Sequence, residues 1–83
     1  MNISSSRHGN VDVVKLPKRL VMANAPSVRK DLLELIALDH RHLVLDLGEV
    51  SFVDSSGLSV LVSALKAAHK VNGSVVLLNL NND

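Results

Sequence analysis

The segment of this chain whose residue types are best suited to chemistry is Asp54, Ser55, Ser56 and Gly57. Asp and Ser are favoured at helix N-caps, so one interpretation is that the run only starts a helix. A serine hydroxyl can also be phosphorylated, which adds roughly −1.5 to −2 charge at neutral pH. The residues alone do not decide between Ser55 and Ser56 as the modified hydroxyl.

Negative charge at this run would affect the domain and a docked partner differently. A phosphate at a helix N-terminus meets free backbone N–H groups and the positive end of the helix dipole, so the domain tolerates it. A like charge across an interface costs several kcal/mol. At about 1.4 kcal/mol per tenfold, affinity falls at least about a hundredfold. The alternative to a simple helix start is therefore a phosphorylation-gated docking surface, where Gly57 would let another surface approach the backbone closely.

A nucleophilic serine is the rival interpretation, because a strand, a turn and a helix surround Ser55 as in a nucleophile elbow. The sequence lacks the G-x-S-x-G pattern, and no His or acid partner is evident by spacing. It also lacks the G-x-x-x-x-G-K-S/T run of phosphate-binding loops. We therefore expect no enzyme.

The histidines and Asp46 are weaker candidates. His40 and His42 flank Arg41, but no third ligand is placed near them, so we expect solvated loop histidines and no metal site. His69 falls late in a helix, where a cation suits the dipole. Asp46 lies inside an apolar strand, where a structural role is expected. Nothing in the sequence indicates a cofactor.

Composition predicts a single domain over residues 1–83. The chain is 47% hydrophobic, yet Phe52 is its only aromatic residue, which disfavours base stacking on nucleic acid. A net charge of +1 with scattered Lys and Arg shows no phosphate-backbone footprint. The chain has no cysteine, no apolar run long enough for a membrane span and no secretory signal pattern. We expect a cytoplasmic protein.

The first half of the chain reads as a hairpin followed by a helix. Residues Ile3–Arg7 and Val11–Leu16 flank a His-Gly-Asn turn and predict two strands. Asn24 can cap the following helix, and Pro26 is tolerated in its first turn. The apolar spacing predicts that this helix ends between residues 38 and 40.

The second half reads as a strand, a helix and a strand. Leu43–Leu47 and Ser74–Leu80 are apolar runs of the kind buried in parallel sheets, and a helix is predicted from Ser56 to Val71. This order places Ser55 beyond the carboxyl end of a central strand. That rim of the sheet is where open α/β folds usually bind their ligands. The helix has two apolar stripes and is expected to be mostly core. Val60 and Ala64, beside Ser56 and Ser59, are a candidate docking patch.

Leu43 to Leu58, LVLDLGEVSFVDSSGL, resembles the signature of STAS domains, the family of anti-sigma-factor antagonists. Pro17–Leu20 with Ala23–Pro26 resembles the segment before that family's first helix, and Val71–Asn79 resembles its later helix-to-strand turn. The match runs from about Val11 onward. The resemblance implies an α/β fold with a mixed β-sheet and helices mainly on one face.

In that family an unphosphorylated antagonist binds an anti-sigma factor that is also a serine kinase, which frees the sigma factor. The kinase phosphorylates the first serine of the motif, here Ser55, and a serine phosphatase restores it. The resemblance implies these partner-binding residues: Asp54, Ser55, Ser56, Gly57, Leu58, Ser59 and Asn24. The alternatives are a non-catalytic STAS subunit of a stress-signalling assembly or lipid-transport system, and a scaffold whose serine is never modified.

Two features depart from the family pattern. Val21 stands where members often have an acidic residue near the partner surface, which bears on the identity of the partner. The family also continues with another helix, often a further strand and a last helix, whereas this sequence lacks the usual C-terminal helix. We expect the uncovered sheet face or edge to favour a homodimer, strand exchange or poor solubility.

Overall fold

The computed structural model describes residues 3–79. Along these residues the elements follow in the order β1 (Ser4–His8), β2 (Val11–Lys15), β3 (Arg19–Leu20), α1 (Ala25–Ala37), β4 (His42–Asp46), β5 (Phe52–Val53), α2 (Ser55–Lys70) and β6 (Ser74–Leu78). The predicted hairpin, helices and later strands are confirmed with slightly shifted ends. Leu80, the predicted end of the last strand, lies outside the described residues.

The main sheet has the strand order β1-β2-β4-β6. β1 pairs antiparallel with β2, whereas β2 with β4 and β4 with β6 are parallel. The turn between β1 and β2 uses Gly9 at φ 66°, a left-handed conformation that glycine adopts without steric cost. The sheet is therefore mixed, as the sequence predicts.

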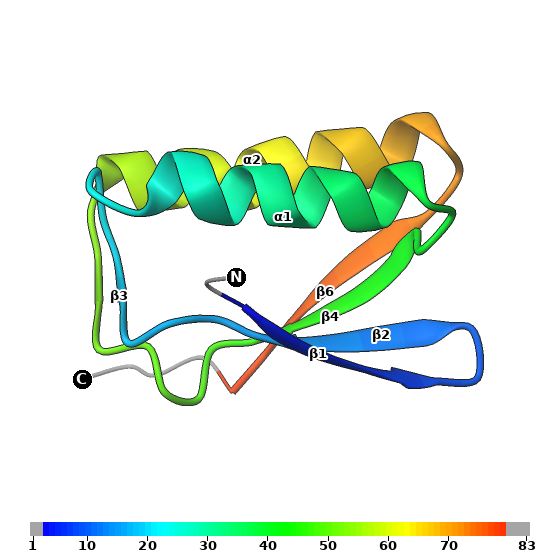
Figure 1. Ribbon diagram of the computed structural model, residues 1–83, viewed down its shortest axis with the longest axis horizontal. Coiled ribbons are helices and arrows are strands. Elements are labelled where there is room, and N and C mark those ends of the chain that lie inside the picture. The colour runs from blue at the N-terminus through cyan, green and yellow to red at the C-terminus, as the bar shows by residue number, and fades with distance from the viewer. Residues whose placement is uncertain (1–2, 80–83) are drawn as a thin grey trace.

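Both helices lie on the same face of this sheet and run in the same direction (Figure 1). Because each follows a strand end on one side of the molecule, α1 and α2 both begin at the same rim and both end at the opposite rim. The other face of the main sheet is free of helices in the part of the chain that is described.

The core lies between the sheet and the two helices. Val14, Leu43 and Leu45 point into it from the sheet and are at most 1% exposed, and α1 contributes the equally buried Val28 and Leu32. The buried residues of α2 are small: Gly57, Val60, Ala64 and Ala68. Small side chains allow α2 to pack closely beside α1, which it contacts along its length.

The predicted docking patch on the second helix is wrong. Val60 is 2% exposed and Ala64 is 1% exposed, so neither is available to a partner. The other stripe, expected to be largely core, is the one at the surface, where Leu58, Val62 and Leu65 are 59%, 43% and 52% exposed. Both stripes are apolar, and the smaller side chains face the neighbouring helix because they permit the closer approach.

The prediction that the last strand is buried is also wrong. β6 is an edge strand, and Val76, Leu77 and Leu78 are 54%, 41% and 44% exposed. Apolar composition predicts burial only if a neighbouring element covers the strand, and within residues 3–79 nothing lies beyond its outer edge.

Sequence analysis missed a second, two-stranded sheet. β3 and β5 pair in parallel with Arg19 opposite Phe52 and Leu20 opposite Val53. Each strand has two residues, too few for a period-2 pattern to be recognised. This small sheet joins the segments that precede α1 and α2, so it sets how the two helix N-termini lie relative to each other.

Neither helix between residues 3 and 79 is long and apolar enough to cross a membrane. The same residues contain no group of three or more His, Asp or Glu side chains arranged to hold a metal ion.

Candidate functional site

The candidate site is built where β5 passes into α2. The backbone N–H of Asp54 donates to the carbonyl of Leu20 at 3.2 Å, which extends the pairing of β5 with β3 by one step. Ser55 is the first residue of α2. The strand pairing therefore fixes the position from which the helix starts.

Asp54 is the N-cap of α2 and holds two segments together. Its Oδ1 accepts a hydrogen bond from the Gly57 backbone N–H at 3.0 Å, and its Oδ2 accepts one from the Met22 backbone N–H at 3.0 Å. The Gly57 hydrogen bond is the main cause that lowers the pKa of Asp54. Asp54 thus ties the first turn of α2 to the loop before α1.

Gly57 serves the chain's own packing. A Cβ added to it would lie 2.2 Å from the carbonyl oxygen of Leu20 and 2.8 Å from Cγ1 of Val53. Gly57 is buried, and the space left by its missing side chain is occupied by β3 of the same chain. The sequence had suggested that a docked protein would approach there. Its contribution to a docking surface is therefore to place α2.

The two serines differ in exposure. Ser55 is exposed and Ser56 is half-buried. Ser59, one turn further along α2, is exposed as well. The first hydroxyl of the run is therefore the one that the fold presents most openly, at the N-terminal end of the helix.

Asn24 does not cap α1 through its side chain as predicted. Its Oδ1 instead accepts a hydrogen bond from the Val21 backbone N–H at 2.9 Å, and its Nδ2 donates to the carbonyl of Arg19 at 2.7 Å. These bonds close the tight loop between β3 and α1. Met22 lies on that loop and is 74% exposed.

A shallow groove of about 300 Å³ separates the N-terminal turns of the two helices. It is lined by Met22, Ala25, Pro26, Arg29, Ser56, Ser59 and Val60. Sequence analysis missed the contributions of Met22 and Arg29. The signal for them is topological, since the residues that follow parallel strands meet at one rim of the sheet.

Beside this groove the rim carries a cation above an aromatic ring. The guanidinium carbon of Arg19 lies 5.0 Å from the centroid of the Phe52 ring, within the range of a cation–π contact. Phe52 is 49% exposed. The chain's only aromatic residue therefore lies at the surface of the rim, next to the N-cap of α2.

The structure brings together most of the residues predicted to bind a partner. Asp54, Ser55, Ser56 and Ser59 occupy the start of α2, and Asn24 shapes the facing loop. Leu58 is different. It lies on the opposite flank of α2, where it lines a separate apolar groove with Leu61, Val62, Leu65, Val75 and Leu77.

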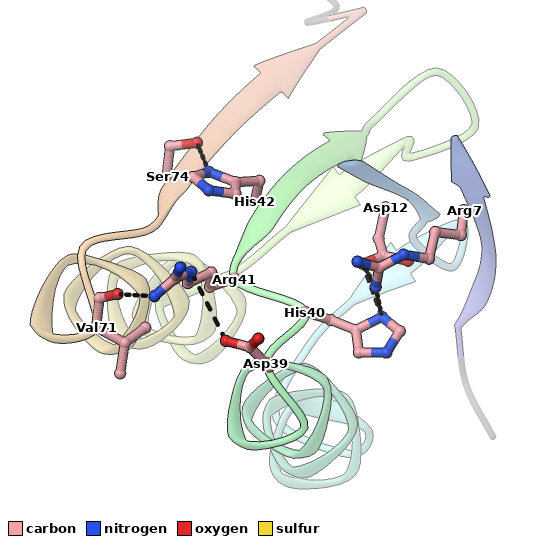
Figure 2. A network of polar contacts seen from close by, with 8 residues as sticks. All are labelled: Arg7, Asp12, Asp39, His40, Arg41, His42, Val71 and Ser74. Atoms are coloured by element: carbon pink, nitrogen blue, oxygen red, sulfur yellow. Dashed lines mark hydrogen bonds and ion pairs between the residues drawn. The ribbon is translucent and has the colours of Figure 1, made fainter. Parts of the chain in front are cut away.

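His40 and His42 lie where the chain passes from α1 into β4, at the end of the helices opposite Ser55, and the expectation of a solvated side chain is wrong for His40 (Figure 2). Its Nδ1 lies 2.8 Å from Oδ2 of Asp12, which is only 2% exposed. Nη1 of Arg7 approaches the same Asp12 oxygen at 3.3 Å and Nδ1 of His40 at 2.7 Å. His42 lies in β4, with its Nδ1 3.1 Å from Oγ of Ser74.

Asp46 ends β4 at the rim where the helices begin. Its Oδ1 accepts hydrogen bonds from Nδ2 of Asn79 and from the backbone N–H of Gly48, both at 2.9 Å. The Asn79 hydrogen bond is the main cause that lowers the pKa of Asp46, and that of Gly48 adds to it. The carboxylate organises the turn after the strand, in line with the structural role predicted for it.

Comparison with known proteins identifies one family. The STAS domain family matches residues 2–83. A protein of Bordetella bronchiseptica named "Putative anti-sigma factor antagonist BtrV" is 34% identical over 58 residues, which are 70% of this chain and 50% of that protein. The chain thus spans about half the length of this curated relative.

Solved structures agree on the fold. The unphosphorylated form of the anti-sigma factor antagonist SpoIIAA gives a TM-score of 0.81 at 20% identity, over 95% of this chain and 74% of that chain. The phosphorylated form of SpoIIAA, from Bacillus, also gives 0.81 at 20% identity, over 96% and 74%. An anti-sigma factor antagonist from Mycobacterium paratuberculosis gives 0.78 at 29% identity, over 90% and 65%. The predicted STAS-like fold is confirmed.

Proposed function

Because the chain belongs to the STAS domain family, we propose that it is an anti-sigma-factor antagonist that binds its partner through the rim around Ser55. The relatives named as antagonists support the general function. The proposed partner is an anti-sigma factor that is also a serine kinase, and a serine phosphatase reverses the modification. Because a kinase of this type uses ATP, the proposed site of action is the cytoplasm.

The observation that carries the proposal is the exposure of Ser55 at the first position of α2, beside the groove between the helices. Its neighbour Asp54 already accepts hydrogen bonds from two backbone N–H groups, Gly57 and Met22. The Asp54 carboxylate therefore has a structural role, which is to fix the backbone around Ser55. Of the two serines in the run, Ser55 is the exposed one, so its hydroxyl is the one that we propose a kinase active site reaches.

Phosphorylation at Ser55 would act on the complex and spare the fold. The phosphate would lie at the N-terminus of a helix of 16 residues, where the dipole and the free N–H groups favour negative charge. A partner seated over Met22 and Ser59 would have to accommodate that charge within the interface. We expect the complex to dissociate while the chain stays folded.

In this proposal the residues of the rim have different tasks. Ser55 carries the phosphate, and Ser56 and Ser59 line the groove that receives the partner. Asp54 and Asn24 hold the two facing segments in place. Leu58 lies on the other flank of α2, so we assign it no contact with this partner.

We further propose that binding, and not catalysis, is the function of the site. His8 contacts Ser6, His40 contacts Asp12 and His42 contacts Ser74, all away from the rim that carries Ser55. Hydrolysis of a generic ester by the purified chain, abolished by Ser55→Ala, would overturn this part of the proposal.

The test combines modification with binding. Incubation with the cognate kinase and ATP, followed by site-mapping mass spectrometry, should place one phosphate on Ser55. Ser55→Ala should abolish it, and the matched control Ser56→Ala should not. In calorimetric titrations Ser55→Asp should bind the kinase at least about a hundredfold more weakly than the parent.

Two outcomes would refute the switch. One is a Ser55→Asp variant that binds as tightly as the parent. The other is tight binding to the kinase with no phosphate on Ser55, which would favour a non-catalytic role in another complex. Circular dichroism of each variant checks that the fold is retained.

A further inference from the structure

Arg29 is the only charged residue among the described residues that line the groove between the N-terminal turns of α1 and α2. It is exposed and lies in the second turn of α1. Its Nε donates a long hydrogen bond of 3.4 Å to Oγ of Ser63 on α2, so the side chain reaches across from one helix to the other. This bond uses one of the five N–H groups of the guanidinium. Most of the donors of Arg29 can therefore serve a group that enters the groove.

The wall of the groove that faces Arg29 is a stripe of hydroxyl groups on α2. Ser56, Ser59 and Ser63 follow one another at about one helical turn each, so they share one face of the helix. Ser56 and Ser59 line the groove, and Ser63 holds Arg29 in place. Hydroxyl groups can donate hydrogen bonds, and no carboxylate is among the described residues of the lining. The polar part of the groove therefore favours an anionic group.

The neighbouring charges of the rim are already engaged within the chain. The guanidinium of Arg19 lies over the Phe52 ring, with its carbon 5.0 Å from the ring centroid. The carboxylate of Asp54 accepts hydrogen bonds from two backbone N–H groups. Arg29 differs from both, because its described contact is a single hydroxyl group. The charge that the groove itself offers to a partner is therefore positive.

The rest of the groove is apolar. Ala25 and Val60 are buried at its base, whereas Pro26 is exposed and Met22 is 74% exposed at its edge. Methionine is flexible and adapts to the shape of a docked surface. We propose that the groove receives an acidic side chain of the anti-sigma factor, a glutamate or an aspartate, whose carboxylate pairs with Arg29 while an apolar neighbour packs on Met22. This inference rests on the proposed function and adds the chemistry that the partner must present.

The form of the groove suits a side chain that another protein presents. Its volume of about 300 Å³ is at the lower limit of sites for small molecules, and it is shallow. A guanidinium binds a carboxylate through two parallel N–H···O bonds, which fixes the orientation of the pair as well as its charge. Arginine is also enriched among the residues that contribute most to binding at protein interfaces. Arg29 is therefore the residue of the groove from which the largest effect on affinity is expected.

An acidic side chain in the groove also gives the phosphate on Ser55 a target within the partner. Ser55 directly precedes Ser56, which lines the groove. A phosphate on Ser55 would therefore lie beside the carboxylate that Arg29 holds. Like charges placed together in an interface repel each other strongly. The same carboxylate would thus attract the partner to the unmodified chain and repel it from the phosphorylated one.

Calorimetric titration of the cognate kinase with variants of the 83-residue chain tests the inference. Arg29→Gln should weaken binding about thirtyfold, because the partner's carboxylate loses its counter-charge, and Arg29→Glu should weaken it at least about a hundredfold. The matched control is Lys30→Glu. Lys30 is exposed on the same helix and does not line the groove, so this variant has the same net charge as Arg29→Glu and should bind like the parent. Circular dichroism of each variant checks that the fold is retained.

A reciprocal change in the kinase identifies the carboxylate. Exposed Asp and Glu residues of the kinase are replaced by Arg one at a time, and one replacement should bind Arg29→Glu more tightly than it binds the parent. Raising NaCl from about 0.05 to about 0.5 M should weaken the parent complex more than the Arg29→Gln complex, because salt screens an ion pair.

Two failures are distinguishable. If Arg29→Glu and Lys30→Glu bind the kinase equally well, or if no replacement in the kinase favours Arg29→Glu, the acidic contact is overturned and the proposed function stands. If the parent does not bind the kinase at all, the proposed function is refuted and this inference is refuted with it.

Discussion

Two aspartates at opposite rims of the molecule are satisfied in different ways. Asp54 accepts its hydrogen bonds from the backbone N–H groups of Gly57 and Met22. Asp12, at the far rim, is approached by the side chains of Arg7 and His40. A carboxylate held by backbone groups leaves the neighbouring side chains free for a partner. A carboxylate held by side chains uses those side chains to stabilise the fold. The rim around Asp12 is therefore suited to a structural role.

The largest effect should come from filling the space beside Gly57, at the rim that carries Ser55. In Gly57→Ala the new methyl group would overlap the carbonyl of Leu20, so α2 must shift from β3. We expect a loss of about 3 kcal/mol, or about 15 °C in Tm, measured by thermal and urea denaturation. Gly9→Asn is the control, because nothing lies within 4 Å of its Cβ position and Asn tolerates its positive φ. Equal losses in the two variants would contradict this assignment.

Removing the far carboxylate should have the next largest effect on stability. Asp12→Ala leaves Arg7 and His40 without their acceptor, but their side chains are 43% and 30% exposed and can turn to water. We therefore expect a loss of about 2 kcal/mol, below the cost of a fully buried pair. Affinity for the proposed anti-sigma-factor partner should not change. A loss of binding without a loss of stability would reverse the roles assigned to the two rims.

Removing the near carboxylate should destabilise less and impair binding more. Asp54→Ala deletes an N-cap and frees the Met22 loop, so we expect Tm to fall by about 5 °C and the affinity for the partner to fall about tenfold. Asp54→Asn serves as the control because asparagine is also a good N-cap. If Asp54→Ala bound the partner like the parent, the carboxylate would have no part in shaping the rim.

The smallest effect is on the pH dependence of stability. The pKa values of Asp54 and Asp46 are lowered in the folded chain, chiefly by hydrogen bonds from Gly57 and Asn79 respectively. Their contribution is therefore present above the unfolded pKa of about 3.9 and is lost as the pH falls through the folded value. Thermal melts between about pH 2 and pH 6 should show a shallower acid decline for Asp54→Asn than for the parent. Identical profiles would contradict the assignment.

The sequence predicts the order of the main elements because hydrophobic periodicity and turn residues are local signals. The hairpin around Gly9 and the helix that begins at Ser55 are both readable in this way. The Arg19–Phe52 contact and the link from Asp54 to Met22 are not, because they depend on β3 and β5, which have two residues each.

Other features escape prediction because burial is decided by neighbouring elements. An apolar strand such as β6 and an apolar stripe such as Leu58 and Val62 look like core until the cover is known. His40 looks like a solvated residue because its partner Asp12 lies 28 positions earlier in the chain. Periodicity assigns the type of an element more securely than it assigns the element's surroundings.

The common direction of α1 and α2 gives the molecule a permanent lengthwise polarity. Each helix contributes partial positive charge at the rim that carries Ser55 and partial negative charge at the rim near His40. An approaching protein with an acidic face is therefore turned toward the Ser55 rim before any contact forms, which raises the fraction of encounters that lead to binding. Added salt should slow this association, since a field of this kind is screened within about 10 Å at 0.1 M.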